Sequence, residues 1–216
     1  MTNIQEIEEY YKNIIMMGES EFTYGPFVIS KNKEGLWVLN KFLPSECECS
    51  YCDKHCLFSD IPSFIQVIGP YAFTKEHSNN CRGITHLIIP NGVQIIEQHA
   101  FSDYGSLEIV SLPETLKRIE DSAFSYCNIK SLYIPDSVEY IGENAFIHNK
   151  HLSKLSLPNN IEIGAYAFGY CGMYADICDV KFKVRPTECD SNKNYNYIRR
   201  DATSFDWSIF RMRAYV

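Results

Sequence analysis

The sequence lacks the features that mark membrane-spanning and secreted proteins. None of its apolar runs approaches the length of about 18 residues that a helix needs to cross a bilayer. The segment Met1–Glu9 has no basic stretch followed by an apolar one, which a secretory signal requires, and the chain contains no Asn-x-Ser/Thr sequon. The sequence therefore predicts a cytoplasmic protein that does not bind membranes.

Motifs that mark common enzymes are absent as well. The chain contains no G-x-x-x-x-G-K-S/T loop, no G-x-G-x-x-G turn and no G-x-S-x-G elbow. Its six histidines are scattered and never show the H-E-x-x-H spacing that binds catalytic zinc. We therefore expect a protein that is not an enzyme.

Positive charge is scarce. The chain has 20 Lys and Arg against 27 Asp and Glu, which gives a net charge of −7. Nucleic-acid-binding proteins usually present a basic face that displaces counterions from phosphates, so we expect no nucleic-acid partner. The negative charge is compatible with a basic protein as partner. A simpler explanation is that the charge only keeps the protein soluble.

The most informative feature that is present is an internal repeat. Five segments run from Ile-Pro or Leu-Pro to Ala-Phe, and their Phe residues recur at intervals of 28, 23, 22 and 22 residues. The long first interval contains an insertion, Thr74–Gly83. The repeated pairs are Pro62 and Phe73, Pro90 and Phe101, Pro113 and Phe124, Pro135 and Phe146, and Pro158 and Phe168. Such a period predicts a stack of similar coils.

Each repeat has the pattern of one coil. Two apolar residues that lie two apart, such as Leu87 and Ile89, predict a short strand with one buried face, which the following Pro ends. A second apolar pair, such as Val93 and Ile96, returns to the core from the opposite wall. Since the Phe occupies the same position in every coil, we expect the five Phe side chains to stack in one buried column.

The pattern I/L-P-x-x-V/L-x-x-I-x-x-x-A-F-x-x-C-x-x-L resembles the BspA-like leucine-rich repeat family. The resemblance covers residues 61–184 and implies a mainly β repeat solenoid, coiled right-handed, with a parallel sheet on one face. Family members are mostly surface adhesins or interaction proteins, and the resemblance implies no enzymatic activity. It therefore favours a protein-binding module.

The flanks of the repeats predict caps. Residues 2–17 carry apolar side chains at spacings of three and four, which predicts an amphipathic helix. The stretches Phe22–Ile29 and Leu36–Phe42 predict a hairpin around Gly35. We expect residues 1–60 to cap the first coil, with a separate functional domain as the alternative. Residues 185–216, which include an alternating stretch at Phe205–Ile209, are expected to form a C-terminal cap.

The outward positions of the predicted strands form the candidate binding surface. Side chains that lie between the buried ones point to solvent, and adjacent coils bring them into one continuous face. The candidate partner-binding residues are His86, Ile88, Glu108, Ile109, Lys130, Tyr133 and Lys154. The apolar members resemble interface anchors, whereas the simpler reading is a solvated sheet face or one covered by a cap. The insertion Thr74–Gly83 is a second candidate.

Six of the nine cysteines fall into two kinds. Cys127 and Cys171 follow the repeat Phe by three residues, where we expect small buried side chains. Cys47, Cys49, Cys52 and Cys56 lie with His55 within ten residues and could hold a tetrahedral zinc ion. Free thiols and disulfides are the alternatives for this loop. No other cofactor is predicted.

The sequence thus predicts a non-catalytic module that binds another protein. A more specific version is an acidic stoichiometric inhibitor of a basic protein, of the immunity type. The alternatives are a cell-surface adhesin and, as a third class, a zinc-binding or thiol-dependent enzyme.

Overall fold

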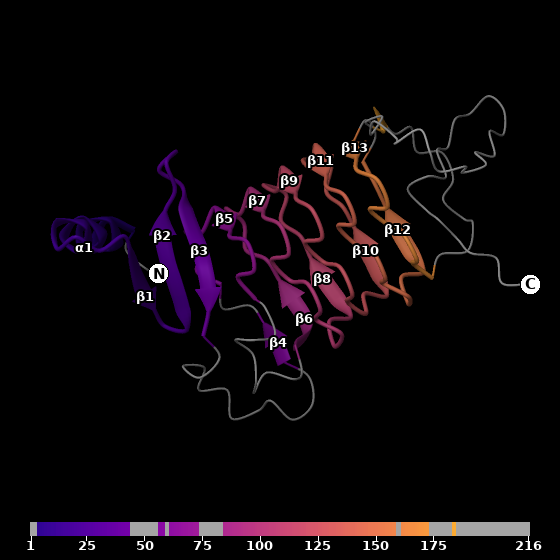
Figure 1. The fold of residues 1–216 in the computed structure, drawn as a ribbon, viewed down its shortest axis with the longest axis horizontal. Helices are drawn as coiled ribbons and strands as arrows, with labels where there is room; N and C mark the ends of the chain where they lie inside the picture. Colours follow the sequence, from indigo (N-terminus) through magenta and orange to yellow (C-terminus); the bar gives the residue numbers. More distant parts are fainter. Residues whose placement is uncertain are drawn as a thin grey trace, which may run out of the picture.

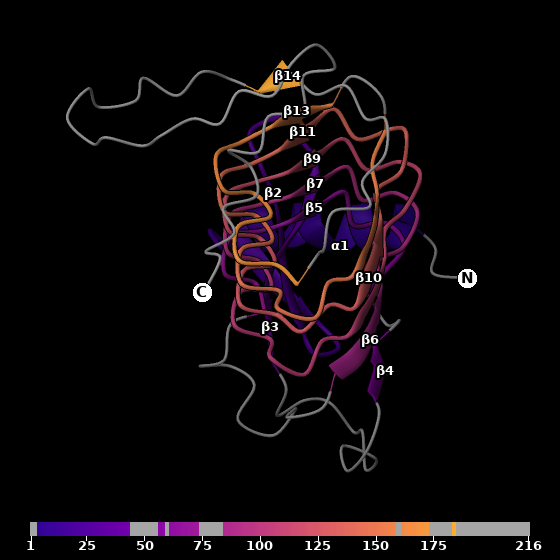
Figure 2. The same ribbon diagram turned by 90° about the vertical axis from the view of Figure 1, so that its right-hand side faces the viewer.

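The computed structural model describes residues 4–43, 61–73, 84–158 and 161–172, together with the backbone of 56–58 and 183–184. These residues form a β-solenoid whose coils stack along one axis, with a helix at the N-terminal end (Figure 1). Viewed end on, the coils have three walls: a sheet on the right, a second sheet of short strands at the top, and a wall of turns on the left (Figure 2). The predicted solenoid is confirmed.

The first wall is the predicted parallel sheet. Neighbouring strands pair in parallel, in the order β12-β10-β8-β6-β4. The strands are β4 (Cys56–Phe58), β6 (Ile84–Ile88), β8 (Ile109–Ser111), β10 (Ser131–Tyr133) and β12 (Lys154–Ser156). In β8 and β10 one buried residue lies between two exposed ones, because successive residues of a strand point to opposite faces. We call the solvent side of this sheet the strand face.

The second wall is also a parallel sheet, which the sequence pattern did not predict. Of each apolar pair expected to return to the core, the second residue, such as Ile96, lies on a strand of only two residues. Each such strand pairs with the same strand of the next coil. These are β5 (Val67–Ile68), β7 (Ile95–Ile96), β9 (Arg118–Ile119), β11 (Tyr140–Ile141), β13 (Glu162–Ile163) and β14 (Lys183–Val184). Two residues are too few to show a period, which is why only their burial could be predicted.

The third wall consists of turns around each repeat Phe. Two residues before the Phe, the chain is left-handed in every described coil, with φ between 54° and 57°, at Tyr71, His99, Ser122, Asn144 and Tyr166. Two residues after the Phe it is left-handed again, with φ between 56° and 66°, at Asp103, Tyr126, His148 and Tyr170. We call residues 71–73, 99–103, 122–126, 144–148 and 166–170 the turn wall.

Backbone hydrogen bonds join the turns of adjacent coils. The Phe101 N–H donates to the Ala123 carbonyl (2.8 Å), and the Phe124 N–H donates to the Ala145 carbonyl (2.7 Å). Left-handed backbone costs an L-residue about 1–2 kcal/mol. The bonds between coils therefore hold a conformation that an isolated turn would avoid.

The predicted Phe column fills the core. Phe73, Phe101, Phe124, Phe146 and Phe168 stack at ring-centroid distances of 4.6, 5.0, 5.3 and 5.2 Å, and each is at most 2% exposed. Each buried ring contributes about 1.5–3 kcal/mol by removing apolar surface from water. The column is thus a main source of stability.

A polar column lies beside the Phe column, three residues after each Phe. The Cys127 thiol donates to the Phe101 carbonyl and the Cys171 thiol to the Phe146 carbonyl, both at 3.3 Å. In the coil between them, Asn149 occupies the same position. As predicted, Cys127 is buried and Cys171 is partly buried.

The N-terminal elements form a three-stranded antiparallel sheet under a helix. They are α1 (Ile4–Met16), β1 (Glu21–Tyr24), β2 (Phe27–Lys31) and β3 (Trp37–Phe42). The prediction of one continuous strand over Phe22–Ile29 is wrong, because Gly25 (φ 54°) and Pro26 break it into β1 and β2. The predicted hairpin between β2 and β3 is confirmed.

This sheet continues directly into the second wall of the solenoid. Strand β3 pairs in parallel with β5, with Val38 opposite Val67 and Leu39 opposite Ile68. Phe42 stacks on Phe73 at 5.2 Å, so the Phe column extends into the N-terminal sheet. The helix closes the outside of the sheet through Tyr11, whose ring packs on that of Trp37 in a T-shaped arrangement with 5.1 Å between the centroids.

Several predictions fall outside the described residues. These are the C-terminal cap over 185–216, the insertion at 74–83, and the segment with Cys47, Cys49 and Cys52. Cys56 begins β4, of which only the backbone is described. The domain boundaries at residues 60 and 184 stay predictions.

Candidate functional site

The predicted partner-binding residues all lie on the strand face and are exposed or half-buried. Strand pairing arranges their outward side chains in rows across the coils. His86 lies opposite Ile109, Ile109 opposite Ser131, and Ser131 opposite Lys154. In the next outward row Ile88 lies opposite Ser111, and Tyr133 opposite Ser156.

The apolar members of the strand face are exposed but not adjacent within a row. Ile88 is 40% exposed, Ile109 44% and Tyr133 53%. Ser111 lies between Ile88 and Tyr133, whereas Ile109 belongs to the neighbouring row. The three side chains therefore form a diagonal patch interrupted by serines.

The charged members of the strand face partly neutralise one another. The Lys130 ammonium lies 2.6 Å from the Glu108 carboxylate in the neighbouring coil. Such an exposed pair contributes about 0–1 kcal/mol. With Lys154 also present, the described part of this face has one carboxylate against two ammonium groups. The strand face is therefore not the acidic surface of the protein.

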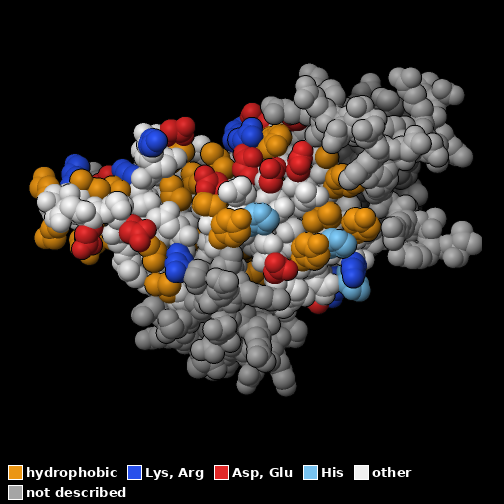
Figure 3. Space-filling view, in the orientation of Figure 1, with side chains coloured by type: hydrophobic (Ala, Val, Ile, Leu, Met, Phe, Trp, Pro, Cys, Tyr) orange, Lys and Arg blue, Asp and Glu red, His pale blue; other side chains and the backbone are white. Residues whose placement is uncertain are grey.

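The turn wall carries a second group of ordered side chains that the sequence interpretation missed. His148 is stacked between Tyr126 and Tyr170, at 4.6 Å from each ring, and Tyr71 stacks on His99 at 4.9 Å. Figure 3 shows this wall towards the viewer, with histidine side chains against hydrophobic ones. The sequence does contain a sign of this stack, because Tyr126, His148 and Tyr170 each follow the repeat Phe by two residues.

Four carboxylates lie beside the turn wall, just before its first left-handed column. We call Glu97, Glu120, Asp121 and Glu143 the acidic belt, and red side chains gather above the stacked rings in Figure 3. Glu120 pairs with Arg118 at 2.7 Å. Burial, and secondarily the charge of Glu120, raise the pKa of Glu97. A group of four acidic side chains thus lies along this side of the molecule.

The stacked His148 imidazole has a lowered pKa. Burial between the tyrosine rings, and secondarily the nearby Lys150 ammonium, lower the pKa of His148. Lys150 places a positive charge at this end of the stack. The ring is therefore favoured in its neutral form near neutral pH.

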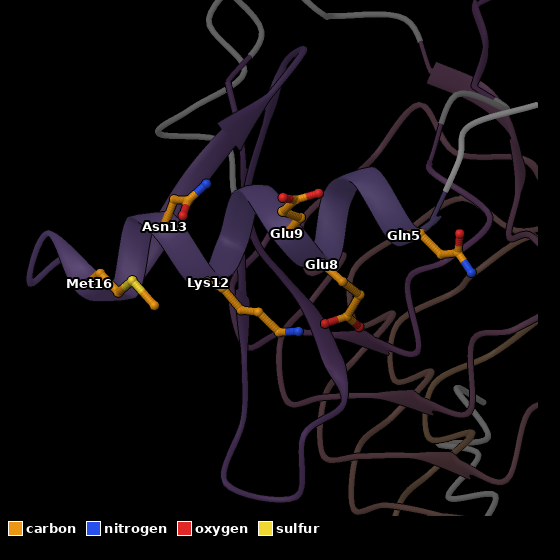
Figure 4. A pocket seen from close by; sticks show the side chains of 6 residues that line it. All are labelled: Gln5, Glu8, Glu9, Lys12, Asn13 and Met16. Carbon is orange, nitrogen blue, oxygen red and sulfur yellow. The ribbon is translucent and has the colours of Figure 1, made fainter.

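A shallow hollow on α1 is lined by the side chains of that helix alone. It is lined by Gln5, Glu8, Glu9, Lys12, Asn13 and Met16. Figure 4 shows that all six side chains project from one helix. Glu8 is paired with Lys31 at 2.7 Å, which ties the helix to β2. The hollow thus has a structural explanation.

The described thiols are poor nucleophiles. Burial raises the pKa of Cys127 to about 12 and that of Cys171 to about 12. Since the thiolate is the reactive form, neither is suited to nucleophilic catalysis.

Metal and membrane features can be assessed only within the described ranges. There, no three His, Cys, Asp or Glu side chains are arranged to hold a metal ion. The zinc site predicted at Cys47, Cys49, Cys52 and Cys56 stays a prediction. No helix in the described part of the chain is long and apolar enough to cross a membrane.

Comparisons with known proteins identify the repeats. Six copies of the BspA-type leucine-rich repeat match residues 66–185. Among solved structures, the leucine-rich repeat protein of T. pallidum is similar, with 22% identity and a TM-score of 0.54, over 69% of this chain and 66% of that one. The pneumococcal vaccine antigen PcpA is similar with 17% identity and a TM-score of 0.51, over 70% of this chain and 42% of that one. The comparison with curated proteins gives no match.

Proposed function

Because the chain belongs to the BspA-type leucine-rich repeat family, we propose that it is a non-catalytic module that binds another protein through its strand face. One observation carries the proposal: Ile88, Ile109 and Tyr133 are 40–53% exposed on a wall of paired strands. Apolar and aromatic side chains with a polar surround are typical of interface centres.

The strand face is suited to binding because its backbone is already fixed by strand pairing. Parallel pairing fixes the backbone of each coil against the next, and each outward side chain stands on this framework. A partner would therefore lose less conformational entropy in ordering this surface than in ordering a loop. Serines between the apolar side chains supply hydroxyl groups for hydrogen bonds at the rim.

A more specific proposal is that the protein is a cytoplasmic stoichiometric inhibitor of a basic protein, of the immunity type. The net charge of −7 supports a basic partner, since opposite charge speeds association. A cell-surface adhesin is the second candidate, favoured by the resemblance to a family that contains surface adhesins. Fractionation of the native cells distinguishes the two, because an inhibitor of this type is found in the cytoplasm and an adhesin on the surface.

The binding proposal is tested with two matched double variants. Ile109→Asp with Tyr133→Asp changes the strand face. Ile15→Asp with Tyr10→Asp changes an Ile and a Tyr of similar exposure, 49% and 53%, on α1. Each variant and the wild type are used to capture partners from native lysate, and the affinity for a captured protein is then measured by calorimetry.

We expect the strand-face variant to weaken binding at least tenfold and the α1 variant to change it less than twofold, because a charge in an apolar interface centre is desolvated without a partner. Equal affinity of the strand-face variant and the wild type would contradict this proposal.

A further inference from the structure

One exposed tyrosine of the turn wall has a described stacking partner on one side only, and the next position of its column on the other side is an aspartate. The second left-handed column consists of Asp103, Tyr126, His148 and Tyr170, on successive coils. Tyr126 stacks on His148 at 4.6 Å through one face. On its other side the column continues with Asp103, which has no ring, and Tyr126 is 52% exposed.

Backbone hydrogen bonds fix the chain at these two positions, and each side chain has one further contact. The Asp103 N–H donates to the Ser125 carbonyl (2.9 Å), and the Tyr126 N–H donates to the Ile147 carbonyl (2.9 Å). The Ser102 hydroxyl also donates to the Asp103 carboxylate at 3.3 Å. Tyrosine has few rotatable bonds, so a ring fixed in this way is a low-entropy contact.

A carboxylate beside an open aromatic face matches the chemistry of a guanidinium group. Arginine is planar, stacks on aromatic rings and forms two parallel hydrogen bonds to a carboxylate. We propose that Asp103 and Tyr126 form a subsite for an arginine side chain of a basic polypeptide. The inference rests on the proposed protein-binding function for the class of ligand, and it adds one arginine contact on the turn wall, a surface separate from the strand face.

The charge distribution supports a cationic ligand at this end of the column. The acidic belt lies on the same side of the molecule, and among the described residues Glu97, Asp121 and Glu143 have no ion pair. Lys150, by contrast, lies near His148, away from Asp103 along the column. Among the described residues, these charges therefore favour a basic segment over an acidic one beside Asp103 and Tyr126.

The test uses the isotope-labelled full chain and three synthetic peptides. One alternates arginine with serine, one has lysine in place of arginine, and one has citrulline, which keeps the shape of arginine without its charge. Amide chemical shifts locate the bound peptide, and calorimetry gives its affinity. We expect shifts at Asp103 and Tyr126, with lysine about fivefold and citrulline at least tenfold weaker than arginine.

Substitutions by asparagine remove the two groups while keeping the backbone, because Asn144 already adopts the same left-handed conformation (φ 56°). Asp103→Asn and Tyr126→Asn should each weaken the arginine peptide about fivefold or more. Asp136→Asn, which removes an exposed charge elsewhere, and Tyr71→Asn, which removes a stacked ring without an adjacent aspartate in its column, should change it less than twofold. Amide spectra of each variant verify that it is folded.

The inference would be overturned by equal binding of the arginine and citrulline peptides, by equal effects of Asp103→Asn and Asp136→Asn, or by no shift at Asp103 and Tyr126. If the Ile109→Asp, Tyr133→Asp variant alone loses the peptide, the ligand binds the strand face. In that case this subsite is refuted and the proposed protein-binding function stands.

Discussion

At the scale of single residues, Asn149 shows how one coil can differ from its neighbours without breaking the stack. Its amide group donates to the Phe124 and Phe146 carbonyls, both at 2.9 Å, and accepts from the Ile129 N–H at 3.0 Å. Cys127 and Cys171 satisfy one Phe carbonyl each in the same column. The position thus requires a donor to a buried carbonyl, and either side chain supplies it.

This requirement predicts different costs for two substitutions at Asn149. Asn149→Ala should lower the free energy of unfolding by about 3 kcal/mol, because it leaves buried backbone groups without partners. Asn149→Cys keeps a donor at the position and should lower it by only about 1 kcal/mol. Urea unfolding of both variants measures the difference. Equal losses would show that a donor at this position has no role.

His148 predicts a pH dependence. Because the pKa of His148 is lowered in the folded protein, folding favours the neutral ring. His148 therefore makes its whole contribution to stability at pH values above the ordinary histidine pKa. The contribution is lost as the pH falls through the lowered folded-state pKa. The difference in unfolding free energy between wild type and His148→Asn should therefore narrow on acidification from pH 7 to pH 5.

The His148 pKa can be measured directly by proton NMR titration of its imidazole. We expect a value below the ordinary one and a partial rise in Lys150→Gln, since burial between the rings, the larger cause, remains. A pKa at or above that of an exposed histidine would contradict the burial of His148 between the tyrosine rings.

At the scale of elements, the sequence was informative where a pattern repeats over several residues. The alternation around Leu87 and Leu132 correctly separated buried from outward positions on the strand face. The two-residue strands, such as β7 and β9, contain no alternation of their own, so their pairing into a sheet could not be predicted. The break between β1 and β2 was available from Gly25-Pro26 and was overlooked.

The turn wall was missed for a different reason. Positive φ is usually recognised from glycine, but its left-handed positions are occupied by Tyr, His, Ser, Asn and Asp. The side chains of Tyr126 and His148 are in contact only because they occupy equivalent positions in adjacent coils. That contact depends on the stacking of the coils, which a single repeat of the sequence does not contain. The arginine subsite was invisible to the sequence for the same reason.

At the scale of the whole molecule, the Phe column couples all described coils. Phe124 is fully buried and lies 5.0 Å from Phe101 and 5.3 Å from Phe146. Phe124→Ala should therefore lower the free energy of unfolding by about 3–5 kcal/mol, through lost burial and the cavity it leaves. Chemical unfolding followed by circular dichroism measures this loss. A loss below about 1 kcal/mol would contradict the role of the column.

The parallel pairing of β3 with β5 also has a consequence for the order in which the protein is made. A ribosome releases the helix and the antiparallel strands first, and these offer a finished strand edge and the Phe42 ring to the next segment. Each later coil needs only about 22 more residues, which take about 1–4 s at 5–20 residues per second. The chain can therefore fold coil by coil during its own synthesis, each new coil templated by the one already in place.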